Sequence, residues 1–153
     1  MENQPIKKVD PLEAILAAQE GNLIDFSTYH VALSELRHGA KRTCWMWYIW
    51  PSLAGVRQHR MPSMIISFAD HIKYLKHEVL GPRLIVITNI AISHLRKNIK
   101  KERLFAGQLD SIKFHETCTA FAAAAIASNN KKAALVYAKA LEFYGGLNDK
   151  VVQ

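Results

Sequence analysis

Apolar residues recur along most of the chain at intervals of three and four, which is the spacing of one face of an α-helix. This period, together with residues that favour helix starts and stops, predicts six helices. Their approximate ranges are 10–20, 25–38, 67–79, 82–98, 110–128 and 131–144. No stretch alternates convincingly between apolar and polar residues, so we expect an all-α fold.

The predicted helix over residues 82–98 carries apolar residues on nearly every side, which indicates a central and buried position. Residues 84–88, Leu-Ile-Val-Ile-Thr, are rich in β-branched side chains and would also suit a strand. The apolar pattern extends beyond twelve residues and ends in basic side chains, which suit a helix C-terminus. We therefore interpret the segment as a helix.

Asp110 is the predicted cap of the helix over residues 110–128. The second half of this helix, residues 120–127, consists almost entirely of alanine, which lets another backbone approach closely. We expect residues 1–9 to be a flexible N-terminus and the last three residues to be frayed. Residues 10–150 then form a single helical domain, a compact bundle of about six helices.

One segment follows neither period. Residues 41–51 read Lys-Arg-Thr-Cys-Trp-Met-Trp-Tyr-Ile-Trp-Pro and hold all three tryptophans of the chain. Each tryptophan can bury on the order of 150–250 Å². One interpretation is an irregular aromatic-rich connector, or a short helix between longer helices, that fills the core. The other is that Trp45 and Trp47 line a pocket and place their indoles for a ligand.

The charge of the chain favours an anionic partner. Lysine and arginine number 20 against 13 aspartate and glutamate, a formal net charge of +7. Residues 36–69 contain no carboxylate, although five cationic side chains lie there: Arg37, Lys41, Arg42, Arg57 and Arg60. Such a surface can bind an anion. Alternatively, these side chains pair with carboxylates elsewhere or are simply solvated.

Other chemistry has little support in the sequence. The seven histidines and two cysteines lack the spacing of a zinc site, so we expect no metal. Phosphate-binding glycine loops are absent, and no cofactor is implied. The chain has no apolar run long enough to span a membrane and no secretory signal at its start, so we expect a cytoplasmic protein without membrane contact.

A polar group does stand out on the predicted helix 110–128. Asp110, Lys113 and Thr117 lie at positions i, i+3 and i+7 and therefore share one stripe of the helix. An acid, an amine and a hydroxyl together could bind or turn over a polar ligand, with Asp110 as the candidate catalytic acid–base residue. The alternative is a helix cap, a local ion pair and a packed threonine.

The sequence resembles a mostly bacterial family known as domain of unknown function 1810. Its members typically read G-x-K-R-S-H-W-M-W-F-x-F-P-Q-x-x-G, and residues 39–55 match this pattern. Residues 80–84, Leu-Gly-Pro-Arg-Leu, match a later motif, and further matches follow up to Asp149. The resemblance implies a mainly α-helical fold and no established activity. The family's polar signature positions correspond here to Lys41, Arg42, Asp110, Lys113 and Thr117.

The chain departs from the family pattern at several places. Cys44 replaces a histidine, Ser52 replaces a glutamine, and residues 55–59 replace a glycine-rich stretch. Val152 stands where the family has a threonine. A fainter similarity links the order of the motifs to small helical glycosidases that act on ADP-ribose-type substrates.

These observations predict a pocket between residues 41–51 and the helix over residues 110–128. Lys41, Arg42 and Lys113 would hold a phosphate or a nucleotide-like anion, and Trp45 and Trp47 would stack against it. Asp110 and Thr117 would add polar contacts, and whether the protein is an enzyme stays open.

The alternative is a nonenzymatic interaction protein that binds nucleic acid or an acidic protein. Its binding surface would be the basic stretch at residues 96–103. In that case the tryptophans would belong to the core.

Overall fold

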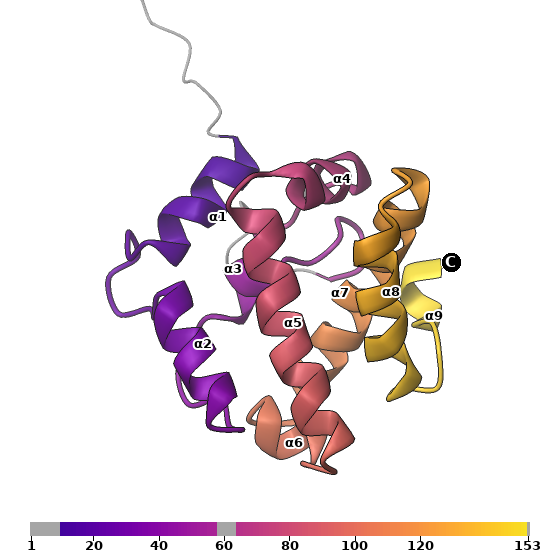
Figure 1. Cartoon of the computed structure of the whole chain (residues 1–153). Helices are drawn as coiled ribbons and strands as arrows, with labels where there is room; N and C mark the ends of the chain where they lie inside the picture. The colour runs from indigo at the N-terminus through magenta and orange to yellow at the C-terminus, as the bar shows by residue number, and fades with distance from the viewer. Residues whose placement is uncertain (1–9, 58–63, 153) are drawn as a thin grey trace, which may run out of the picture.

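Helices provide the regular structure of the computed structural model, which describes residues 10–57 and 64–152 (Figure 1). The helices are α1 Pro11–Gln19, α2 Tyr29–Arg37, α3 Met46–Ile49, α4 Phe68–Lys76, α5 Leu80–Arg96, α6 Lys101–Leu104, α7 Gln108–Ala127, α8 Lys131–Glu142 and α9 Asp149–Val152. Within these ranges the β-structure is one isolated bridge between Leu53 and Ile66. The predicted all-α fold is therefore confirmed. The expectation for residues 1–9 lies outside the described residues.

Each of the six predicted helices is present, with shifted ends. Helix α2 begins after Thr28, whose hydroxyl accepts a hydrogen bond from the Val31 N–H, rather than at Asp25 or Ser27. Helix α4 begins after Ser67, which caps it as predicted. The prediction of a frayed C-terminus is wrong for Val151 and Val152, because both belong to the short helix α9.

Asp110 is not a helix cap, contrary to the prediction. Helix α7 begins two residues earlier, after Gly107, which has the left-handed φ of 130° that glycine adopts readily. Asp110 lies instead in the first turn, where a carboxylate is favoured by the helix dipole. Its side chain is therefore available for contacts with other elements.

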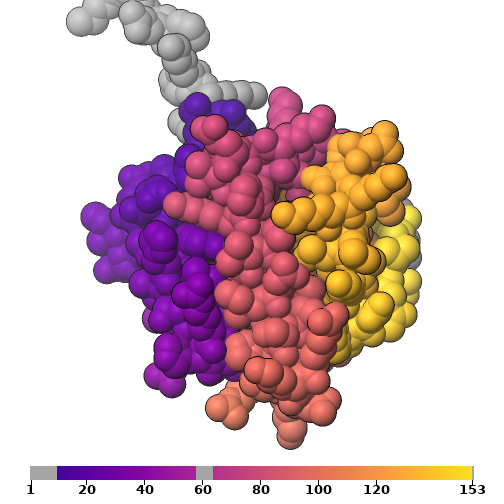
Figure 2. Space-filling view, viewed as in Figure 1, coloured from indigo at the N-terminus to yellow at the C-terminus, as the bar shows by residue number. Residues whose placement is uncertain are grey.

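Helix α5 runs through the middle of the molecule, between α1 and α2 on one side and α8 on the other (Figure 1). The space-filling view shows it as a strip of surface between these two groups (Figure 2). The predicted central position is thus correct, but burial on nearly every side is not. Val86 is 44% exposed, because one side of α5 has no helix packed over it.

Gly81, in the first turn of α5, permits a close approach between α5 and the end of α4. A Cβ atom at this position would lie 2.5 Å from the backbone oxygen of Leu75. No larger residue fits there without displacing backbone. The glycine of the Leu-Gly-Pro-Arg-Leu motif therefore has a packing role.

Helices α7 and α8 pack together more extensively than any other pair of described helices, and the rings of Phe121 and Tyr137 stack between them. Ala124 and Ala125 on α7 and Ala133 and Ala140 on α8 are fully buried. The small side chains let the two helices approach closely, as the sequence predicted.

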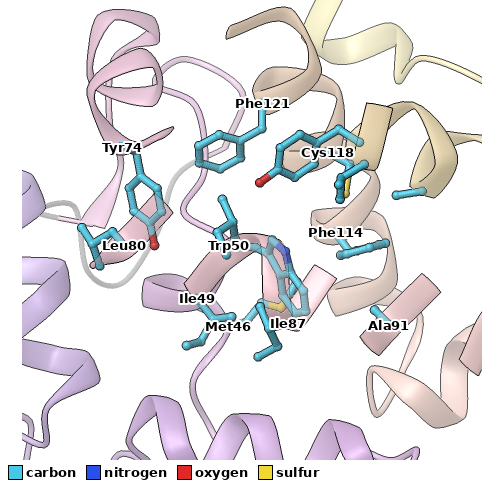
Figure 3. Packing of buried hydrophobic residues seen from close by; sticks show 14 of the residues in the cluster. Met46, Ile49, Trp50, Tyr74, Leu80, Ile87, Ala91, Phe114, Cys118 and Phe121 are labelled. Atoms are coloured by element: carbon cyan, nitrogen blue, oxygen red, sulfur yellow. The ribbon is translucent and has the colours of Figure 1, made fainter. Parts of the chain in front are cut away.

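The centre of the core is Trp50, which is 1% exposed. Figure 3 shows its ring among the side chains of Met46, Ile87 and Phe114. The ring of Phe114 stands edge-on to it at a centroid distance of 4.9 Å. The indole N–H donates to Thr88 Oγ1 at 3.0 Å. For Trp50, the interpretation that residues 41–51 fill the core is therefore correct.

No helix in the described part of the chain is both long enough and apolar enough to cross a membrane.

Candidate functional site

Glu35, near the end of α2, fixes the conformation of the segment that follows it. Its carboxylate accepts hydrogen bonds from the backbone N–H groups of Arg42 and Thr43 at 2.7 and 2.9 Å. It also accepts from Thr43 Oγ1 at 2.6 Å and from Trp45 Nε1 at 2.9 Å. Burial alone would raise the pKa of Glu35, but these hydrogen bonds outweigh it and lower the pKa.

Lys41 reaches from this segment to the start of α7. Its backbone N–H donates to the carbonyl oxygen of Leu104 at 2.8 Å, which ties the segment to α6. Its ammonium lies 3.1 Å from Asp110 Oδ2 and 5.2 Å from the ring centroid of Trp45. The side chain is only 9% exposed.

Asp110 receives a second ammonium from its own helix. Lys113 Nζ lies 3.7 Å from Asp110 Oδ1, so the two lysines share one carboxylate. Burial lowers the pKa of Lys113, and the positive charges of Arg57 and Lys41 lower it further against the opposing effect of Asp110. Lys113 Nζ is also 6.0 Å from the ring centroid of Trp47.

One turn further along α7, Glu116 pairs with Arg57. Arg57 Nε lies 2.5 Å from Glu116 Oε1, and the glutamate is 5% exposed. We refer to Lys41, Arg57, Asp110, Lys113 and Glu116 as the charged cluster. Glu116 was not among the predicted site residues, although the three-residue interval Asp110–Lys113–Glu116 is a visible signal of neighbours on one helix.

The carboxylates of the charged cluster change the interpretation of the acid-free stretch 36–69. Lys41 pairs with Asp110 and Arg57 pairs with Glu116, so two of its cations meet carboxylates from α7. For Lys41 and Arg57, the alternative that the cations of this stretch pair with carboxylates from other parts of the chain is therefore correct. The cluster nevertheless contains three cations and two carboxylates.

Three of the predicted site residues occupy other positions. Arg42 is exposed and lines a separate hollow of about 220 Å³ with Ser34, Glu35 and His38. Among the described residues, no ion pair joins its side chain to the charged cluster. Trp45 is 0% exposed, and its indole N–H is taken by Glu35. Thr117 is buried and donates to the carbonyl oxygen of Trp50 at 3.3 Å.

Trp47 differs from the other two tryptophans because it is only partly buried. It lies on α3, edge-on to Phe26 at a centroid distance of 5.4 Å, and on the Lys113 side of the charged cluster. Of the three indoles it is therefore the one that can contact a ligand without unpacking the core.

Other reactive groups do not gather in the described ranges. No three histidine, cysteine, aspartate or glutamate side chains there form a cluster that could hold a metal ion. Cys44 is exposed, whereas burial raises the pKa of the Cys118 thiol well above its ordinary value. A larger, mainly apolar hollow of about 360 Å³ lies between α7 and α9, lined in part by Leu53, Phe68 and Leu147.

Comparison with known proteins places the chain in a family. It matches the family model described as Protein of unknown function (DUF1810) over residues 10–152. It is similar to the crystal structure of the conserved hypothetical protein Rv1873 from Mycobacterium tuberculosis, at 28% identity and a TM-score of 0.75. That alignment covers 94% of this chain and 96% of the mycobacterial chain. No curated protein matches the chain significantly. The family match spans nearly all of the sequence, and the chain therefore belongs to the DUF1810 family.

Proposed function

We propose that the protein binds an anionic small molecule at the charged cluster, and that the anion is a phosphate group such as that of a nucleotide or an ADP-ribose-type metabolite. One observation carries this proposal. The ammonium groups of Lys41 and Lys113, with side chains only 9% and 13% exposed, share the single carboxylate of Asp110. Two cations held so close together with one counter-ion favour a further anion.

The charge balance of the cluster supports the same conclusion. Three cations against two carboxylates leave one positive charge in a partly desolvated place, where each electrostatic interaction is stronger than in water. A bound phosphate would offset that charge. It would also oppose the effect of Arg57 and Lys41 on Lys113 and raise the pKa of that lysine again.

Trp47 gives the proposed site an apolar wall. A partly exposed indole next to an ammonium suits a ligand that joins a planar ring to an anionic group. Trp45 and Thr117 support the site from behind, because both are buried and hydrogen-bonded within the protein.

The geometry favours binding over catalysis. Both oxygens of Asp110 already face an ammonium, which makes it the centre of an ion-pair network rather than a free acid–base group. If the ligand is turned over, Asp110 is the first residue to test. An Asp110→Asn variant would then lose turnover of a nucleotide that the wild type cleaves.

We expect Lys41→Ala and Lys113→Ala each to weaken binding of AMP, ADP-ribose or inorganic phosphate by about tenfold or more, since hydrogen bonds to charged groups contribute roughly 1.5–3 kcal/mol. Isothermal titration calorimetry gives the Kd, and thermal shift gives a rapid screen of the ligands.

Lys132→Ala is the matched control, because Lys132 is an exposed lysine on α8 and loses the same charge. It should bind as the wild type does. Equal affinity in all four proteins, or no binding of any of these anions by the wild type at millimolar concentration, would contradict the proposal.

A second candidate function is supported by the basic end of the molecule. Arg96, Lys97, Lys100 and Arg103 are exposed around the C-terminus of α5 and the start of α6 (Figure 1). Within the described ranges none of the four forms an ion pair. We propose nucleic acid as the partner of this surface, held through its phosphates.

If this surface binds nucleic acid, a Lys97→Ala and Lys100→Ala double variant should bind a DNA or RNA oligonucleotide more weakly. The slope of log Kd against log salt concentration should fall by about two, because two phosphate contacts are removed. Fluorescence anisotropy over a range of salt concentrations measures both. A Kd that is independent of salt concentration and unchanged in the double variant would contradict this candidate. Binding to polyglutamate in place of nucleic acid would contradict it as well.

A further inference from the structure

Glu116 has one carboxylate oxygen that no described residue satisfies. Oε1 pairs with Arg57, whereas Oε2 is buried and has no hydrogen-bond partner among the described residues. A buried charged oxygen without a donor is unfavourable, and native proteins rarely leave one in that state. The position therefore calls for a hydrogen-bond donor from outside the described part of the protein.

The position of Glu116 connects it to the proposed anion site. Asp110, Lys113 and Glu116 follow each other at intervals of three on α7, which places successive Cβ atoms about 5–6 Å apart. Arg57 is linked to both residues, since it pairs with Glu116 and its positive charge lowers the pKa of Lys113. Glu116 thus lies about one helical turn from Lys113 on α7.

The surrounding charges decide which donor fits. A cationic donor would be repelled by Arg57 and Lys113, which act together on this side of α7. A neutral hydroxyl suffers no such repulsion and donates well to a carboxylate. Carboxylates at nucleotide sites commonly accept a hydrogen bond from a ribose hydroxyl in this way.

We infer that Glu116 is a specificity-determining residue of the charged cluster and that its Oε2 accepts a hydrogen bond from a sugar hydroxyl of the ligand. The ligand class is accordingly a phosphorylated ribose, with its phosphate at Lys41 and Lys113 and a hydroxyl at Glu116. This inference rests on the proposed function, because the phosphate positions the sugar.

The test compares AMP, 2′-deoxy-AMP, 3′-deoxy-AMP and inorganic phosphate on the full chain by isothermal titration calorimetry. We expect at least one deoxynucleotide to bind the wild type about tenfold more weakly than AMP, because removal of the hydroxyl leaves Glu116 unpaired. This comparison needs no variant, so it holds even where a substitution impairs folding.

Glu116→Gln should reduce that preference to about threefold, since a neutral acceptor forms a weaker hydrogen bond than an ionised one. Its affinity for inorganic phosphate should be unchanged or tighter, because a negative charge is removed next to the anion. Glu142→Gln, which changes an exposed carboxylate on α8, should keep the wild-type preference.

Different results would overturn the role of Glu116 and the anion site itself. Equal affinity for AMP and both deoxynucleotides, with phosphate still bound, overturns the role of Glu116 and leaves the anion site intact. A preference that Glu116→Gln leaves at its full size also overturns that role. No binding of phosphate or of any nucleotide overturns the proposed function and this inference with it.

Discussion

Replacing Trp50 with alanine is expected to lower the free energy of unfolding by about 3–5 kcal/mol, the usual loss for a large buried aromatic side chain. The indole is 1% exposed and packs against the rings of Phe105 and Phe114, with centroids 5.9 and 4.9 Å away. Its removal leaves a cavity at the centre of the core and also deprives Thr88 of the indole N–H donor. Urea denaturation followed by far-UV circular dichroism measures the change without relying on tryptophan fluorescence.

Trp47→Ala is the matched control, because it removes the same side chain from a partly buried position. The loss of stability there should be about 1–2 kcal/mol, in proportion to the smaller apolar area that leaves water. If both variants lost the same stability, Trp50 would not be the central residue of the core. The pair also separates a structural tryptophan from the one proposed to contact a ligand, since only Trp47→Ala should weaken AMP binding without a large effect on folding.

The long helices could be predicted because their period repeats over several turns. Residues 82–98 illustrate this. Their apolar pattern extends well beyond the β-branched Leu-Ile-Val-Ile-Thr stretch, which by itself also suits a strand. The four-residue helices α3, α6 and α9 are too short for a period to develop; α6 and α9 were not predicted, and for α3 the sequence left a connector and a short helix open. The exposed side of α5 at Val86 was also missed, because exposure depends on which neighbouring helices are present.

The candidate site was predictable in its local parts. The spacing of Asp110 and Lys113 predicts neighbours on one helix, and the two lie 3.7 Å apart. No local pattern shows that Lys41, almost 70 residues earlier, meets the same carboxylate; the family resemblance alone grouped these residues in advance. The different burial of Trp45 and Trp47 was likewise hidden, because it is set by contacts with α2 and α7.

Carboxylates outside the acid-free stretch turn out to organise it. Glu35 lies immediately before residues 36–69 and holds the loop at Arg42 and Thr43. Asp110 and Glu116 approach the stretch from α7. A cationic segment without acids of its own is thus positioned by acids from two helices, and this arrangement brings its Lys41 and Arg57 to carboxylates of α7.

Glu35→Ala is expected to destabilise the protein by on the order of 3 kcal/mol and to weaken AMP binding at the same time. The substitution leaves the buried N–H of Trp45 without an acceptor, which costs about 1–3 kcal/mol. It also releases the backbone of Arg42 and Thr43, each hydrogen bond contributing roughly 1 kcal/mol. Lys41 directly precedes these two residues, so its ammonium would no longer be held at Asp110. Chemical denaturation and calorimetry with AMP measure the two effects.

The pH dependence of Glu35→Gln gives an independent check, since it reports on the charge rather than the shape of the side chain. The pKa of Glu35 is lower in the folded protein than its ordinary value of 4.5, so the ionised carboxylate stabilises the fold above that value. This contribution is lost as the pH falls through the folded pKa. The stability difference between wild type and Glu35→Gln should therefore be largest near neutral pH and should shrink on acidification below about pH 4. Glu142→Gln, at an exposed carboxylate, should show little difference at any pH. A stability difference between wild type and Glu35→Gln that is independent of pH would mean that the loop is held without the charge of Glu35. The position of Lys41 would then depend on its contacts with Leu104 and Asp110 alone.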